Sequence, residues 1–530
     1  MEDQIKQPFK WRSYNLGICL IFLFSVQAFY IQSSMILNAD VSFLSQMAIY
    51  SEGSDFYLQF YEVNPPLIVY IYKLFISIGS VLHINDISAL RVGMLIYIFL
   101  CSSIILYNFI NIKNGLLIAL TLSFCLFFTF PNDFLQREHI ITGSFLSYCS
   151  MISIRLLGVS PNKKVIVANI LIIALAISLK PQYSIVFLVS ELYLSYHLKS
   201  IKTLFRKENF LILLLGLVYV SFVYFNHETY FSTVVPLAST SYSSYFISIE
   251  DLFLLPIILL LVSFLPLRFI YTHSRNSPLM TTVTYVILIY LSSIVTFLIG
   301  RTGFSYHLLL TANLALFFVF LFMYSSFASL RSKRRLKDII PLSLAICSLV
   351  YLHSMSYYNV LPNSRLSVNH NNIDSLVNIV LDNEENRHLS PLFNSIALSS
   401  IPQDKVFAIT TTLYPINSIA RHSQLQWVNK FPAMWSLPNH VNSENEESKE
   451  VLKLVIESIK NDIVSNSPEI IIIETSEELK RLPSGFSFID FIRSSSVISE
   501  ELNKYEIFDT IMIRKYRDME FTIYKRILDE

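Results

Sequence analysis

Long apolar runs recur through the first two thirds of this sequence, and they constrain its fold more than any other feature. A helix needs about 17–25 mostly apolar residues to cross a bilayer. Eleven runs approach or meet that length: residues 14–37, 91–111, 115–131, 140–158, 165–180, 183–198, 210–226, 252–270, 280–299, 306–330 and 339–356. Hydrophobic residues make up 53% of the chain and charged residues only 15%, a balance too apolar for a water-soluble globular protein. We therefore expect a polytopic α-helical membrane protein of about eleven transmembrane helices.

One further apolar stretch, residues 65–83, decides the topology, because counting it as a span inverts every loop that follows. Short cytoplasmic loops carry most of the Lys and Arg of a membrane protein. If residues 65–83 lie on the membrane surface, eighteen basic residues before residue 357 fall on the cytoplasmic side. Only five then fall on the outer side, namely Lys73, Arg91, Arg137, Lys180 and Arg301. The charge pattern therefore predicts an outer juxtamembrane helix at 65–83 and a cytoplasmic N-terminus.

The composition changes after Tyr357. Residues 357–530 hold 24 of the 39 acidic residues and no run of membrane length. Short strand-like runs at 406–412, 469–474, 505–513 and 521–524 alternate with helical patterns such as 446–462, which is typical of a small α/β domain. We expect two domains, a transmembrane domain at 1–356 and a soluble extracytoplasmic α/β domain at 357–530.

Ionisable residues on the predicted outer side are the first candidates for chemistry, since such groups are costly at membrane depth. The first outer loop runs from Asn38 to Leu67, and Asp40 opens it directly after the first span. Apolar surroundings could raise the pKa of the Asp40 carboxyl and suit it to general-base work. An ordinary interfacial helix cap is the alternative. For Glu52 and Asp55, a solvated loop position is favoured.

The second outer loop contains Gln136-Arg137-Glu138-His139 at the mouth of a predicted span. These side chains could place a carboxylate, a phosphate-binding guanidinium and an imidazole around one site. A local Arg137–Glu138 pair that only caps the helix is the alternative.

Two further outer turns carry isolated basic residues. Lys180 stands before Pro181 in a tight turn, where it could meet a phosphate or extend to lipid headgroups. Arg301, Tyr306 and His307 lie close together in another turn, a pattern suited to a phosphate or diphosphate clamp.

Other chemistries find less support. His139, His307 and the outer carboxylates could hold a divalent metal, but no spaced ligand signature is present. The sequence has no Walker loop, dinucleotide fingerprint or Ser nucleophile elbow. A net charge of +1 and the absence of a basic tract with interleaved aromatics argue against nucleic acid as a partner.

With these motifs in view, the sequence resembles the C-type (GT-C) membrane glycosyltransferases, close to the protein O-mannosyltransferase and lipid A aminoarabinose transferase group. The resemblance covers roughly residues 10–330. It is carried by Asp40, the Glu62-Val63-Asn64-Pro65-Pro66-Leu67 run, Arg91, Gln136-Arg137-Glu138-His139, Lys180-Pro181 and Tyr306-His307. Many relatives have an acidic pair after the first span, where this chain has Asp40-Val41, so the resemblance leaves metal use open.

The resemblance implies an enzyme that transfers a sugar from a polyprenyl-phosphate donor, with inversion, on the outer face of a bacterial inner membrane. It implies that Asp40 is the base and Glu138 the second acidic residue. The substrate-binding and lipid-phosphate contacts that it suggests are Glu62, Arg91, Arg137, His139, Lys180, Arg301, Tyr306 and His307. The acceptor could be a lipid, a polysaccharide or a protein.

Three other readings stay open. A lipid-linked glycan transporter would be expected to carry charges midway through several spans, whereas here they gather at the outer helix ends. An O-antigen ligase or polymerase-type enzyme would also use polyprenyl-linked sugars on the outer face. A scaffold whose exported tail carries the role is the third.

Overall fold

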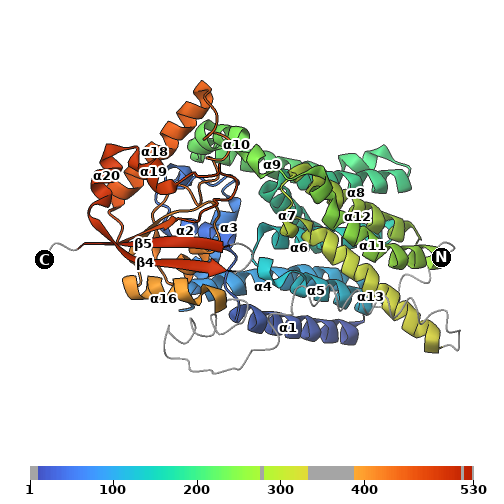
Figure 1. Cartoon of the computed structure of the whole chain (residues 1–530). Helices are drawn as coiled ribbons and strands as arrows, with labels where there is room; N and C mark the ends of the chain where they lie inside the picture. Colours follow the sequence, from blue (N-terminus) through green and yellow to red (C-terminus); the bar gives the residue numbers. More distant parts are fainter. Residues whose placement is uncertain (1–9, 275–279, 332–386, 515–517, 528–530) are drawn as a thin grey trace. The chain divides into compact units, whose positions relative to one another are not determined.

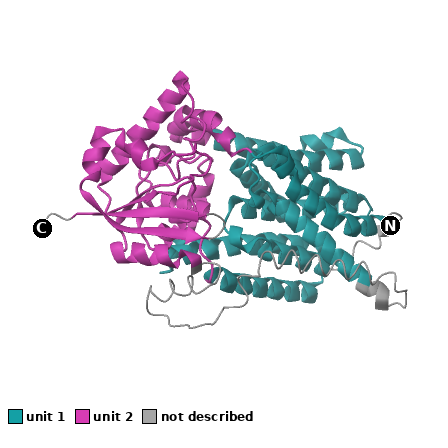
Figure 2. Cartoon of the chain, in the orientation of Figure 1, with its two compact units in different colours: residues 1–33, 78–220, 247–358 teal, residues 34–77, 221–246, 359–530 magenta. Residues whose placement is uncertain are grey.

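The computed structural model describes residues 10–274, 280–331, 387–514 and 518–527. These residues belong to two compact units, which Figure 2 shows in different colours. Unit 1 comprises Met1–Ser33, Ile78–Val220 and Ile247–Tyr358, and unit 2 comprises Ser34–Ser77, Ser221–Phe246 and Asn359–Glu530. The chain thus passes between the units several times. The predicted division at residue 357 concerns the side of the membrane on which each part lies, and it stays a prediction.

Unit 1 is helical (Figure 1). Its helices are α1 (Trp11–Ser33), α4 (Asp86–Phe109), α5 (Gly115–Phe128), α6 (Arg137–Leu156), α7 (Lys163–Leu179), α8 (Ser184–His197), α9 (Lys207–Asn226, in this unit as far as Val220), α11 (Ile249–Ser274), α12 (Met280–Gly300) and α13 (Leu309–Arg331). Asparagines cap two of them: the Asn85 side chain accepts from the Ser88 amide before α4, and Asn162 accepts from the Lys164 amide before α7. Such caps satisfy backbone donors that the first turn of a helix leaves without partners.

Among the described residues, six helices are long and apolar enough to cross a membrane. They are Trp11–Ser33, Asp86–Phe109, Lys207–Asn226, Ile249–Thr272, Met280–Gly300 and Ser305–Ser326. The expected class, a polytopic helical membrane protein, is confirmed. The count of eleven spans stays a prediction, and the predicted span 339–356 lies outside the described residues.

The stretch that decides the predicted topology forms the short helix α3 (Leu67–Val81). Its 15 residues would extend about 22 Å at the usual helical rise, less than the roughly 30 Å of a bilayer core. This length agrees with a helix that lies on the membrane surface, although the orientation of the chain stays a prediction.

Helix α6 is the most enclosed helix of unit 1 and also one of the most polar. Nearly all of its side chains are buried, including serines at every third position from 144 to 153. These hydroxyls bond to neighbouring helices: Ser144 to Tyr97 of α4 at 2.6 Å, and Ser147 to Asn169 of α7 at 3.1 Å. Small hydroxyl residues let helices approach closely and bond across the interface. Helix α6 therefore crosses the interior of unit 1 with several of its hydroxyl groups bonded to other helices.

Unit 2 contains a five-stranded mixed sheet with the order β2-β1-β3-β5-β4. Its strands are β1 (Lys405–Ile409), β2 (Gln426–Trp427), β3 (Ile470–Glu474), β4 (Tyr505–Arg514) and β5 (Asp518–Arg526). Strands β1, β2 and β3 are parallel, and β5 runs antiparallel to both β3 and β4. The helices of this region are α16 (Ser390–Ser399), α17 (Ile416–His422), α18 (Glu446–Asn466), α19 (Phe488–Arg493) and α20 (Ser496–Leu502). The expected C-terminal α/β fold is confirmed as a mixed β-sheet with helices.

The sheet region does not form unit 2 alone. Residues expected to be the first outer loop contain helix α2 (Ala39–Tyr50), whose Phe43, Leu44 and Met47 side chains are fully buried. Helix α2 packs on α17, where Arg421 Nε donates to Ser45 Oγ at 3.0 Å. The sequence analysis did not predict this helix, because its apolar residues have a partner helix far along the chain that the local sequence does not reveal. The outer location of the segment stays a prediction.

Candidate functional site

A buried ion pair joins two helix connections of unit 1. Glu138 lies in the first turn of α6, and Lys180 follows the last residue of α7. Lys180 Nζ donates to Glu138 Oε1, and the side chains are 8% and 0% exposed, respectively. The helix macrodipole favours an acid in the first turn of a helix and a cation after the last, so both charges occupy favourable helix ends.

A third connection reaches the same pair. The 3-10 turn η8 (Ser305–Leu308) precedes α13 and places His307 Nε2 3.5 Å from Glu138 Oε1. The Tyr306 ring centroid lies 5.7 Å from Lys180 Nζ, within the range of a cation–π contact. Three connections, which precede α6, α8 and α13, therefore meet around Glu138.

Local geometry fixes the η8 turn. Tyr183, in the 3-10 turn η4 (Pro181–Tyr183), donates its hydroxyl to the His307 carbonyl at 3.1 Å. Gly303 has a φ of +69°, and a Cβ there would lie 2.3 Å from Ile247 Cδ1. The turn before η8 therefore favours glycine for its backbone conformation, and a larger residue would also displace the end of the Ile247 side chain.

Aromatic rings lie beside the ion pair. The Phe304 and Tyr306 rings are stacked, with centroids 5.5 Å apart and an interplanar angle of 9°. The Tyr306 ring also meets the His307 ring edge-on at 4.5 Å. Since these rings are half-buried, they form a partly open aromatic surface next to Lys180.

Two cations act on Glu138. Arg137 is 3% exposed, and its positive charge acts on Glu138 together with that of Lys180. The second carboxylate oxygen, Glu138 Oε2, is buried and has no hydrogen-bond partner among the residues that the structure describes. This carboxylate oxygen can accept a hydrogen bond from the hydroxyl of a bound molecule.

Three other predicted site residues belong to unit 1, namely His139, Arg91 and Arg301. His139 is buried, with its ring 5.3 Å from that of Phe134. Arg91 is buried in α4, whereas Arg301 is exposed after α12 and accepts the Ile247 amide on its carbonyl at 3.1 Å. The proposed phosphate contacts of Arg91 and Arg301 stay predictions.

Asp40 and Glu62 belong to unit 2. Asp40 lies half-buried in the first turn of α2, after Asn38, whose side chain accepts from the Asp40 amide at 3.0 Å. Glu62 is buried, and its Oε1 accepts the Asn64 amide at 3.0 Å. The shared site of Asp40 and Glu138 stays a prediction.

Metal binding was left open by the sequence. Within the described ranges, no group of three or more His, Cys, Asp or Glu side chains is arranged to hold a metal ion.

Glu191 of α8 is a residue that the sequence prediction overlooked. It lies within the predicted span 183–198, is 1% exposed and pairs with Arg206. A carboxylate inside an apolar helix needs a partner, and this rule would have found it. The expectation that charges gather only at the outer helix ends was therefore incomplete.

Comparison with known proteins supports the predicted fold. No protein-family model matches the sequence, and no curated protein matches it. Two crystal structures of ArnT from Cupriavidus metallidurans match this chain, one bound to undecaprenyl phosphate and one in the apo state. Their TM-scores are 0.51 and 0.52 at 9% and 10% sequence identity, and each match covers 96% of this chain and 97% of that chain. The resemblance predicted from the sequence is thus confirmed at the level of the fold, which is similar to that of ArnT over nearly the full length.

Proposed function

We propose that this protein is a membrane glycosyltransferase that transfers a sugar from a polyprenyl-phosphate donor to an acceptor of the cell envelope. The observation that carries the proposal is the buried Glu138–Lys180 pair, with Arg137 and His307 beside it, in a chain with the fold of ArnT. That ArnT structure is bound to undecaprenyl phosphate. In the proposed reaction, a polyprenyl phosphate of this kind remains when the donor has lost its sugar.

In the proposed reaction, the acceptor hydroxyl oxygen attacks the anomeric carbon as the bond from that carbon to the phosphate oxygen breaks, with inversion. Asp40 takes the proton of the acceptor hydroxyl as general base. Lys180 and Arg137 stabilise the polyprenyl phosphate as it leaves. Glu138 holds Lys180 in place through Oε1 and offers Oε2 to a sugar or acceptor hydroxyl. The stacked Phe304 and Tyr306 rings suit one face of a sugar.

The proposed location is the outer face of a bacterial inner membrane, since the positive-inside rule puts the connections that precede α6, α8 and α13 on that side. The predicted domain at 357–530 would then be extracytoplasmic. Labelling in intact cells of a cysteine introduced at Asn132, an exposed position in the connection before α6, tests this topology. Labelling only after the membrane is permeabilised would contradict the outer location.

The test of function uses the purified chain in liposomes with undecaprenyl-phosphate sugars that carry a labelled sugar, together with envelope lipid, polysaccharide and protein fractions. The expected result is release of undecaprenyl phosphate and transfer of the label to one acceptor fraction. Asp40→Asn and Glu138→Gln should strongly reduce both, while Lys504→Met in unit 2 should not. Movement of the intact donor across the bilayer without release of undecaprenyl phosphate would favour the transporter instead.

A further inference from the structure

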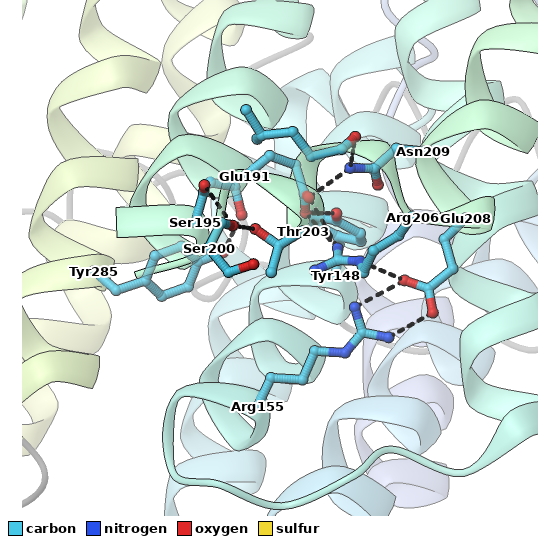
Figure 3. Close-up of polar contacts among 12 residues, drawn as sticks. Tyr148, Arg155, Glu191, Ser195, Ser200, Thr203, Arg206, Glu208, Asn209 and Tyr285 are labelled. Carbon is cyan, nitrogen blue, oxygen red and sulfur yellow. Dashed lines mark hydrogen bonds and ion pairs between the residues drawn. The ribbon is translucent and has the colours of Figure 1, made fainter. Parts of the chain in front are cut away.

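A second buried glutamate of unit 1 is bonded through both of its oxygens (Figure 3). Arg206 NH2 donates to Glu191 Oε1 at 2.9 Å and to Oε2 at 2.8 Å. Asn209 Nδ2 donates to Oε2 at 2.6 Å, and the Tyr148 hydroxyl donates to Oε1. The Glu191 side chain is 2% exposed, so the protein itself replaces the water that this carboxylate would otherwise bind.

The network continues to a second carboxylate. Arg155 NH1 and NH2 donate to the two oxygens of Glu208, each at 2.8 Å. Arg206 Nε donates to Glu208 Oε2 at 3.0 Å, so Arg206 links both glutamates. Two guanidinium groups thus meet two carboxylates, and the cluster is neutral. We call these residues, together with Tyr148 and Asn209, the α6–α8–α9 network.

The connection from α8 to α9 is itself folded tightly beside the network (Figure 3). Ser195 Oγ donates to the Ser200 carbonyl at 3.0 Å, and Thr203 Oγ1 donates to the same carbonyl at 2.7 Å. Asn209 also donates to the Leu204 carbonyl at 3.2 Å. Arg206, Glu208 and Asn209 are therefore held in a compact turn and present their side chains to α6 and α8 together.

The network joins the same two helices that adjoin the Glu138–Lys180 pair. Tyr148 and Arg155 lie on α6, ten and seventeen positions after Glu138, or about 15 and 25 Å along the helix at the usual rise. Glu191 lies on α8, which begins directly after the η4 turn that follows Lys180. A shift of α8 along α6 would consequently move the η4 turn relative to Glu138.

Stability alone does not explain a buried cluster of this kind. Removing charged groups from water costs free energy, and the attraction between the buried charges often does no more than offset this cost. Apolar side chains of similar size in their place are therefore often neutral or stabilising. A network whose charged groups are bonded to one another, by contrast, favours one arrangement of the elements that it joins.

We propose that the α6–α8–α9 network positions α8 against α6 and thereby sets Lys180 against Glu138. Tyr148, Arg155, Glu191, Arg206 and Glu208 are on this view positioning residues that touch no substrate. The expected effect on undecaprenyl phosphate binding rests on the proposed function. The expected effect on the positions of α6 and α8 can be measured without any ligand.

The main test replaces all four charged groups at once with Arg155→Met, Glu191→Met, Arg206→Met and Glu208→Met. Undecaprenyl phosphate is titrated onto the purified full-length chain, and backbone hydrogen exchange is measured at residues 139–142 and 183–186. We expect a melting temperature equal to or above that of the wild type, affinity for undecaprenyl phosphate about tenfold weaker, and faster exchange in both segments. The matched control removes the Glu501–Lys504 pair of unit 2 with two methionines and should change none of these.

Each outcome has a distinct meaning. Equal affinity and unchanged exchange in the quadruple variant would overturn the positioning role. A wild type that binds no undecaprenyl phosphate would instead contradict the proposed function, while the exchange data would still decide whether the network holds the two segments. If the quadruple variant fails to fold, Glu191→Gln takes its place: about threefold weaker binding with faster exchange at residues 183–186 supports the role, and wild-type values overturn it.

Discussion

Glu138 and Glu191 are both buried in unit 1, yet their surroundings differ in almost every respect. Glu138 binds Lys180 through one oxygen and leaves the other without a hydrogen-bond partner among the described residues. Glu191 has both oxygens bonded, by Arg206, Asn209 and Tyr148. A buried polar atom without a partner costs about 1–3 kcal/mol. Such a cost is most easily understood where a bound molecule completes the bonding. We therefore interpret Glu138 as part of a binding site and Glu191 as part of a structural network.

The bonding of the carboxylates differs in the same direction. Lys180 and Arg137 act on Glu138, whose Oε2 has no hydrogen-bond partner among the described residues, whereas the α6–α8–α9 network bonds two guanidiniums to two carboxylates. The first cluster retains an acceptor for a bound molecule, and the carboxylates of the second are bonded within the protein. Substitutions at the first should therefore alter chemistry, and substitutions at the second should alter structure.

The largest effect is expected for Lys180→Met. This change removes the cation that would stabilise the departing phosphate, so turnover of the donor should fall by at least about 100-fold. The variant also leaves Glu138 buried without its partner, which is destabilising. The double variant Glu138→Gln with Lys180→Met corrects for this, because it should recover stability without recovering turnover. A double variant with wild-type turnover would exclude the pair from the reaction.

Glu138→Gln and Glu191→Gln test the difference between the two glutamates under equal conditions, since each substitution removes one charge and keeps the shape of the side chain. Glu138→Gln should reduce transfer about 100-fold or more, within the range of lost acid–base or orienting groups, whereas Glu191→Gln should reduce it less than tenfold. Initial rates at saturating donor measure both. Similar losses of transfer rate in the two variants would show that the distinction between a binding site at Glu138 and a structural network at Glu191 is wrong.

How far the sequence predicts this cluster depends on how local the signal is. Glu138, Lys180 and His307 are ionisable residues at helix ends that the sequence predicts to be on the outer side, so each could be named as a candidate from the sequence, and the structure brings them together. Their chemical roles stay predictions. The partners of Glu191 were missed because Arg206 and Asn209 lie after a turn whose fold no local pattern specifies.

The fold, too, could be predicted from the sequence only where the signal is local. Apolar runs and strand patterns locate most helices and the strands β1, β3, β4 and β5 within a few residues. Helix α2 was not predicted because it packs on α17, hundreds of residues further along the chain. Strand β2 (Gln426–Trp427) was not predicted because it has only two residues and depends on its pairing with β1. Such contacts leave little trace in either segment alone.

A third buried acid, Asp462 of unit 2, extends the comparison to a carboxyl without an ion pair of the Glu138 kind. Its Oδ2 accepts the Lys430 amide at 2.8 Å, and Tyr61 lies nearby. Burial raises the pKa of the Asp462 carboxyl to about 7, although the Lys430 amide and ammonium oppose this shift. Because the folded pKa lies above the unfolded value, the stability from protonation is fully present below about pH 4 and is lost as pH rises through about 7.

Asp462→Asn should therefore stabilise unit 2 more at pH 8 than at pH 5, by a difference of about 2 kcal/mol. The asparagine oxygen can still accept the Lys430 amide, so the hydrogen bond is retained. Denaturation midpoints of the full-length variant and wild type at the two pH values measure the difference. A gain that does not depend on pH would mean that Asp462 does not titrate in this range.

The smallest effect is expected for Tyr148→Phe, which removes one donor from Glu191 and leaves Arg206 and Asn209 in place. Loss of this hydrogen bond should lower stability by about 1 kcal/mol and leave the affinity for undecaprenyl phosphate within twofold of wild type. Thermal melting and ligand titration of the same preparation measure both. A large loss of affinity without a change in melting would place Tyr148 in the binding site instead of the network.

The most direct test of the account is the affinity of the purified chain for undecaprenyl phosphate, compared between the wild type and Lys180→Met. Lys73→Met is the matched control, because Lys73 lies over the Phe56 ring and donates to the Ser51 carbonyl within unit 2. The account predicts binding that weakens at least about 30-fold, roughly 2 kcal/mol, in Lys180→Met and less than twofold in Lys73→Met. Equal affinities of the wild type and Lys180→Met would contradict it.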